Sequence, residues 1–258
     1  MKRIMRTLAI SLGLSCALAV ATPQAASAQE ANGFGEKGEL IISADRLLPL
    51  FSYSSESVSS NQNGVDTKTS DSATSVALLL GREPSLAVNP HTVPRIAIDY
   101  TVINHLTVGG TFVLAFGLGG THQTETGTVT VKTDAPKATV VGFAPRVGYV
   151  LPLGHTFGFW PRAGFAFYSI SQKSDRTVGN NTTTVTDTDS IWSLDLDPQF
   201  VWVPLQHFFV HFGPLMNIPF AGSRSTEIVS GSNTTTTKND LSVFHFGLSA
   251  GLGGWFDL

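Results

Sequence analysis

The sequence predicts an all-β protein: an eight-stranded antiparallel transmembrane β-barrel with four long extracellular loops and short periplasmic turns. Three observations support this fold. Bulky apolar residues alternate with small or polar ones over long segments, which is the period of a β-strand. After the first 28 residues no apolar run approaches the length of about 18 that a spanning helix would need. Long polar segments alternate with tight turns, as in outer-membrane barrels.

The N-terminus predicts a cleaved signal peptide over residues 1–28. Three basic residues among the first six precede an apolar stretch at 8–20, and Ala26-Ser27-Ala28 is a small-x-small cleavage site. The apolar stretch is shorter than the roughly 20 residues of a spanning helix. An uncleaved anchor, or a lipoprotein acylated on Cys16, is the alternative. Cleavage would remove Cys16, the only cysteine, so the mature chain could hold neither a disulfide nor a thiolate metal site.

Composition limits the classes of partner. The chain is 42% hydrophobic and 14% charged, with 25 Gly and 17 Phe, which excludes a disordered protein. Lys and Arg total 16 against 19 acidic residues. With no excess of positive charge to hold a phosphate backbone, we expect no nucleic acid partner.

The alternation also predicts which face meets lipid. From Leu106 to Leu118 the even positions are mostly Leu, Val and Phe, whereas the odd positions are mostly Gly, Thr and Ala. The segment from Phe244 to Leu258 repeats this pattern. A soluble sandwich would carry charged groups on its second face. Small residues instead suit the crowded inside of a narrow barrel, and a band of Phe and Leu suits hydrocarbon.

We expect a short periplasmic segment at 29–38 and the barrel at 39–258. The predicted strands are 39–54, 94–103, 106–118, 138–151, 156–171, 190–203, 207–222 and 240–256. The polar loops between them are 55–93, 119–137, 172–189 and 223–239. Within the first loop, residues 75–80 are apolar enough to form an extra strand.

The signal peptide, the alternating strands, the long loops and the C-terminal Gly254-Trp255-Phe256-Asp257-Leu258 resemble the small outer-membrane barrel family of Gram-negative bacteria, the OmpA/OmpX-like and opacity-like proteins. The resemblance implies a monomer in the outer membrane, in contact with membrane lipids and lipopolysaccharide. It also implies that the barrel-assembly machinery recognises the last strand through Phe256 and Leu258. The family usually ends in Phe, and Leu258 departs from that pattern.

Charged residues of the predicted strands fall mainly on the inward face, where a charge is stable only when paired. Six lie at a similar height and predict an ion-pair network that fills the lumen: Asp45, Asp99, Arg146, Arg162, Asp197 and His211. Arg95, Asp195 and His245 share that face. Arg46 does not fit the alternation, and a bulge near Pro49 would explain it. The other interpretations of the network are a proton or ion path, or a catalytic carboxylate and histidine.

No catalytic signature accompanies these residues. The sequence has no Gly-x-Ser-x-Gly, phosphate loop or dinucleotide motif. Ser249 and His245 share a face, but four residues of strand separate them by about 13 Å. His105, His155 and His207 occupy successive turns, too far apart for one zinc ion. We therefore expect no enzyme, cofactor or metal, and a structural, adhesion or surface-interaction role through the loops, which would contact any extracellular partner. A small passive pore and a lipid-modifying enzyme are the alternatives.

Overall fold

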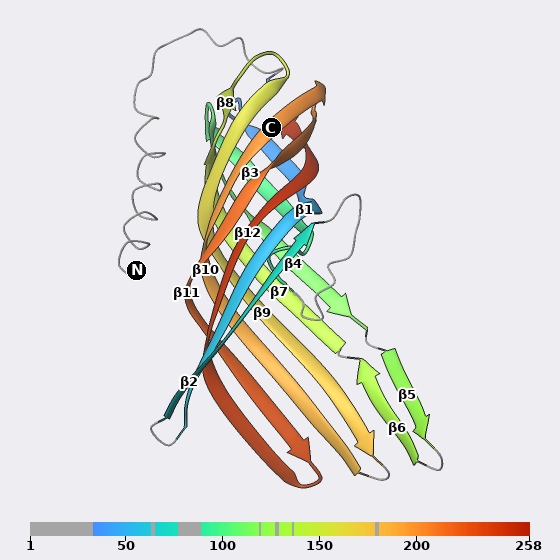
Figure 1. Cartoon of the computed structure of the whole chain (residues 1–258). Helices are drawn as coiled ribbons and strands as arrows, with labels where there is room; N and C mark the ends of the chain where they lie inside the picture. The colour runs from blue at the N-terminus through green and yellow to red at the C-terminus, as the bar shows by residue number, and fades with distance from the viewer. Residues whose placement is uncertain are drawn as a thin grey trace.

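The computed structural model describes residues 33–62, 65–76, 89–118, 120–126, 129–135, 137–178 and 181–258. These residues form an all-β, antiparallel structure, as predicted (Figure 1). The predicted signal peptide lies outside the described residues, as do positions 29–32 of the predicted periplasmic segment. The described part of the chain contains no helix long and apolar enough to cross a membrane.

The strands close into a ring. Their bounds are β1 (Glu39–Gln62), β2 (Val65–Val76), β3 (Arg95–Ile103), β4 (Leu106–Gly117), β5 (Gly120–Thr126), β6 (Val129–Ala135), β7 (Lys137–Tyr149), β8 (Leu151–Pro152), β9 (Phe157–Val178), β10 (Asn181–Leu205), β11 (Phe208–Ser230) and β12 (Asn233–Asp257). Pairings run from β1 through β3, β4, β7, β9, β10 and β11 to β12, which pairs with β1 again. We call the end that holds β8 and Leu258 the terminal end, and the opposite end the hairpin end.

Much of what the sequence predicts as loop is paired strand. β9 and β10 pair up to Val178 and Asn181, and β11 and β12 pair up to Ser230 and Asn233. β1 and β2 form a third hairpin, and β5 and β6 a fourth. The reason is that these segments are rich in Thr and Val, which favour extended backbone, and cross-strand hydrogen bonds stabilise them even when both faces are polar. Figure 1 shows these hairpins projecting beyond the ring.

The predicted extra strand at 75–80 is only partly described. Ser75 and Val76 end β2, which pairs with the distal half of β1. Residues 77–88 lie outside the described segments, so the predicted count of eight spanning strands and four loops stays a prediction.

The two faces of the wall differ as the alternation predicts. On the outer face, Ile96 and Phe112 are 62% and 53% exposed, whereas the inward Ala97 and Val113 are fully buried. Glycines allow close approach on the inside. A Cβ on the inward Gly164 would collide with the carbonyl oxygen of Pro145 on the neighbouring strand.

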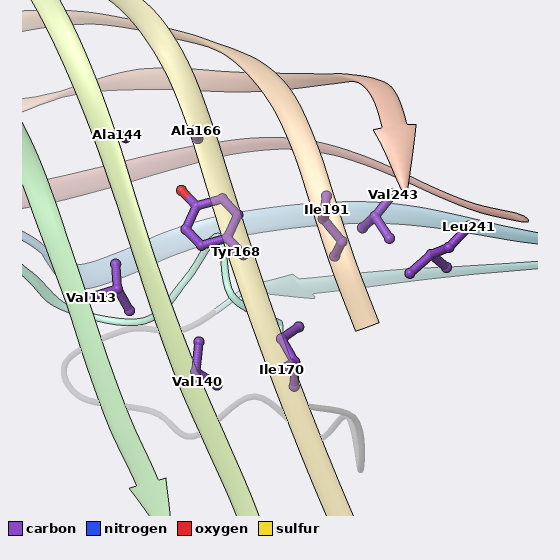
Figure 2. Close-up of a cluster of buried hydrophobic side chains, with 9 residues drawn as sticks. All are labelled: Val113, Val140, Ala144, Ala166, Tyr168, Ile170, Ile191, Leu241 and Val243. Atoms are coloured by element: carbon purple, nitrogen blue, oxygen red, sulfur yellow. The ribbon is translucent and has the colours of Figure 1, made fainter. Parts of the chain in front are cut away.

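Side chains fill the lumen in layers. At the terminal end, Phe34 packs against Trp160, Phe209 and Trp255. The residues before β1 hold Phe34 there, because the amide of His105 donates to Gly35 O at 2.7 Å. Towards the hairpin end a second apolar cluster includes Val113, Val140, Tyr168, Ile170, Ile191 and Val243 (Figure 2). Polar side chains occupy the lumen between these clusters.

Candidate functional site: the lumen and its outer cup

The inner polar layer is centred on Asp45, near the start of β1. Asp45 Oδ2 lies 2.5 Å from Arg146 Nη1 and 3.2 Å from Arg162 Nη1. Asp45 Oδ1 lies 3.1 Å from His211 Nε2 and accepts a hydrogen bond from Ser43 Oγ. The contacts from Arg162 Nη1 and His211 Nε2 do not meet hydrogen-bond geometry. One carboxylate therefore faces three groups from β7, β9 and β11.

Two further carboxylates complete this layer. Asp99 accepts two hydrogen bonds from Arg146, at 3.0 Å from Nε and 2.6 Å from Nη2. Asp197 lies 2.5 Å from Arg162 Nη2 and accepts a hydrogen bond from Gln199. Gln199 Oε1 in turn lies 3.0 Å from His211 Nδ1. The structure thus brings together the six residues that the sequence places at one height, and every ionic side chain among them is buried.

A second polar layer lies closer to the hairpin end and contains the other three predicted residues. Asp195 accepts hydrogen bonds from Arg46 Nη2 at 3.0 and 3.1 Å. Arg95 donates to the Tyr168 hydroxyl at 2.7 Å. His245 stacks on His91, with ring centroids 5.3 Å apart. Asp195, Arg95 and His245 therefore contact groups other than the Asp45 network.

The side chain of Arg46 lies in the lumen, although the alternation of the sequence assigns it to the outer face. Ala44 pairs with Leu252 and Leu48 pairs with Ala250, so three residues of β1 oppose the single residue Gly251. Within this bulge Arg46 adopts a φ of 57°, which turns its side chain inward. The predicted bulge near Pro49 is a second one, between Pro49 and Phe51. In the sequence, the indication of a bulge is an arginine at a position that the alternation assigns to the lipid-facing side.

His91 was missed because it lies within the predicted loop 55–93. Its carbonyl oxygen accepts a hydrogen bond from Arg46 Nη1 at 2.7 Å, and its ring is fully buried. Ser54 Oγ lies 3.1 Å from His245 Nδ1. The ring of His91 stacks on the ring of His245. In the described segments no three His, Cys, Asp or Glu residues are placed to hold a metal ion.

Beyond the second layer the lumen opens into a cavity of about 440 Å³, which we call the cup. Ser52, Ser54 and Asn89 line it together with Ile170, Ile191 and Val243. Its polar side is formed by Glu56, Asp71, Asp189 and Arg224, contributed by β1, β2, β10 and β11.

Arg224 crosses one side of the cup. It donates to both oxygens of Asp189 at 2.7 Å and to Glu56 Oε1 at 2.6 Å. The hydrogen bonds from Arg224 to Asp189 raise the pKa of the guanidinium further above its usual range. Arg224 therefore stays charged and fixed in place.

The C-terminal residues predicted as an assembly signal lie on the outer face. Phe256 pairs with Leu40 of β1 and is 57% exposed, and Leu258 is 82% exposed. Leu258 N donates to Gly38 O. Both side chains are accessible at the terminal end, and recognition by an assembly machinery stays a prediction.

The pairings and the two faces define a closed antiparallel β-barrel with an apolar exterior and a filled lumen. No family model matches the chain, and no curated protein matches it.

Three solved structures are similar. The outer membrane protein OprG from Pseudomonas aeruginosa is 14% identical with a TM-score of 0.42, over 89% of this chain and 100% of that one. Ail, the attachment invasion locus protein of Yersinia pestis, is 14% identical with a TM-score of 0.32, over 85% and 99%. The outer membrane protease OmpT from Escherichia coli is 10% identical with a TM-score of 0.37, over 84% and 97%. The strand pairings of this chain define its fold independently of these similarities.

Proposed function

We propose that this protein is a monomeric barrel of the Gram-negative outer membrane, exported by a cleaved signal peptide, with a surface-interaction or structural role. One observation carries the proposal. Side chains fill the lumen at the Phe34 cluster and at the Asp45 network, while polar hairpins extend the wall at one end. Among the described residues, these two layers obstruct the passage of solute along the lumen, whereas the hairpins offer a surface on which a partner can bind.

The outer face supports the membrane location. Large apolar side chains such as Phe112, Phe165 and Phe220 are 53%, 57% and 60% exposed around the ring. A band of this kind in water would be an aggregation site, whereas in a bilayer it meets hydrocarbon. The longer polar hairpins then belong outside the cell and the tight turns belong in the periplasm.

The filled lumen disfavours the pore. Between Arg146, Arg162 and Asp197 the cavity is only about 10 Å³, no more than the minimum that one water molecule needs. The aromatic cluster around Phe34 lies on the terminal-end side of this cavity. Among the described residues, the side chains that contact His245 Nδ1 are Ser54 and Asn89, neither of which is an acid, so this pair does not favour the catalytic alternative.

Cysteine labelling tests the orientation. Ser232 lies at the tip of the β11–β12 hairpin and His155 in the turn before β9, and both are exposed. We expect a membrane-impermeant maleimide to label Ser232→Cys on intact cells, and His155→Cys only after the envelope is opened. Labelling of His155→Cys on intact cells would reverse the proposed orientation.

Register-preserving deletions test the interaction role. Lys173 pairs with Thr186, and Thr226 pairs with Thr237. Replacing residues 174–185 and 227–236 each by Asn-Gly should therefore close shorter hairpins with two-residue turns. We expect the shortened barrel to fold, shown by heat-modifiable gel migration, while the producing cells lose the attachment to an immobilised extracellular-matrix extract that the unmodified protein confers. Attachment unchanged by the deletions would contradict an interaction through the hairpins.

A further inference from the structure

The cup has the dimensions and walls of a small-molecule site. Its volume of about 440 Å³ falls within the range of about 300 to 1,000 Å³ typical of ligand pockets. Such sites combine apolar walls with a few fixed polar groups. Here Ile170, Ile191 and Val243 supply the apolar wall.

Polar groups inside the cup are held in place. Ser54 Oγ accepts a hydrogen bond from Asn89 Nδ2 at 2.5 Å and lies 3.1 Å from His245 Nδ1. Arg224 is fixed between Glu56 and Asp189. Because these side chains are already ordered, a ligand would not have to order them on binding.

The charges that line the cup favour a ligand of positive charge. Glu56, Asp71 and Asp189 line the cavity with the single cation Arg224, an excess of two negative charges. Glu56 and Asp71 are directly opposite one another across the β1–β2 pairing. Like charges in that position destabilise a sheet, and a bound cation between them would relieve the repulsion.

In the wall of the cup, a charged residue on one strand pairs with an apolar residue on the neighbouring strand. Glu56 pairs with Val243 across β1 and β12, and Asp189 pairs with Ile170 across β10 and β9. Neighbouring strands are about 5 Å apart. A matching ligand therefore carries its charge close to an apolar body, as an arylmethyl ammonium ion does with one methylene between its nitrogen and its ring.

We propose that the cup binds small amphipathic organic cations, with the ammonium group at Glu56 and Asp71 and the apolar body against Ile170, Ile191 and Val243. The site is separate from the hairpin interaction proposed above, because none of its lining residues lies in the deleted segments 174–185 and 227–236.

Three probes of one size and different charge test the site: 4-(trifluoromethyl)benzylammonium, the corresponding benzyl alcohol and the corresponding benzoate. Fluorine NMR titrations use the mature chain in nanodiscs of zwitterionic lipid, with empty nanodiscs subtracted. We expect saturable binding of the cation, at least about tenfold tighter than that of the benzoate. No saturable binding of the cation, or binding of the benzoate at least as tight, would overturn the proposal.

Variants locate the site. Glu56→Gln combined with Asp71→Asn should weaken binding of the cation about tenfold and leave the alcohol nearly unchanged. Glu227→Gln is the matched control, since Glu227 is an exposed carboxylate of β11 outside the cup. Ala73→Trp, on the exposed strand β2, should fill the cavity and abolish binding of all three probes. A cation affinity unchanged in both cup variants would place binding elsewhere and overturn the proposal.

The same samples are scored for heat-modifiable migration and maleimide labelling. Loss of these signals would contradict the barrel and its orientation. Their retention without probe binding would overturn the cup alone.

Discussion

Each arginine of the inner polar layer is stable in the lumen because carboxylates from other strands surround it. Arg162 lies against Asp45 and Asp197, and its guanidinium also lies 4.6 Å from the ring centroid of Trp160. Removing one member of such a buried set leaves the others without compensation, which costs more than the pair itself contributes. We propose that the ion pairs act mainly to fix the register of β1, β9 and β10.

We expect Arg162→Met to reduce the free energy of unfolding by about 3 to 5 kcal/mol. Urea titration in detergent micelles, followed by the heat-modifiable gel shift, measures it. Adding Asp197→Leu should restore part of the loss, because the stranded carboxylate is then gone. The exposed Lys238→Met serves as the control and should change stability by less than about 0.5 kcal/mol. A cost for Arg162→Met as small as the control would contradict a paired network.

At the level of single residues, the sequence could predict the inward face wherever the strand is regular. Alternation alone assigns Asp99 and Arg146 to the lumen, since neighbours such as Ile98 and Val147 face outward. It assigns Arg46 to the outer face, because a bulge of β1 shifts the alternation; the misplaced arginine indicates a bulge but not its exact position. It also fails at His91, whose position depends on contacts with Arg46 and His245 that are distant in sequence.

Among the elements, the segment before β1 and the hairpins depart most from the sequence prediction. Polar composition predicts loops, but it does not report that the same residues can pair across a hairpin. The segment before β1 carries no strand pattern, yet Phe34 enters the terminal end of the lumen, where it is 3% exposed. Its packing is a property of the closed ring, because Trp160, Phe209 and Trp255 come from three different strands.

Phe34→Ala should therefore lower the free energy of unfolding by about 3 to 5 kcal/mol, the usual cost of removing a buried phenyl ring. The same urea titration measures it. Phe157→Ala is the comparison, because Phe157 is 51% exposed on the outer face at the same end of the ring. A loss below about 1 kcal/mol for Phe34→Ala would contradict the packing of Phe34 inside the lumen.

Taken as a whole, the molecule is a wall closed by its first and last strands, and the described side chains fill its lumen at the Phe34 cluster and at the Asp45 network. The β1–β12 pairing extends from Glu39 with Asp257 to Ser59 with Asp240. Since one edge of the sheet pairs with the other along this length, the barrel leaves no free edge there for a second copy to extend. This closure is compatible with the monomer that we propose, whose interactions would occur at the hairpins and the cup.

Planar-bilayer recordings test the closed lumen directly. We expect no steady channels from the folded protein, because the cluster around Phe34 and the Asp45 network block the lumen one behind the other. Phe34→Ala should stay silent as well, since it opens only the first of these layers while Arg146 and Arg162 still fill the second. Insertion is checked in the same preparation by protease cleavage of the hairpins. Steady conductance in the unmodified protein that disappears in Arg146→Ala or Arg162→Ala would instead make the charge network an ion path, and the passive pore would replace the closed barrel.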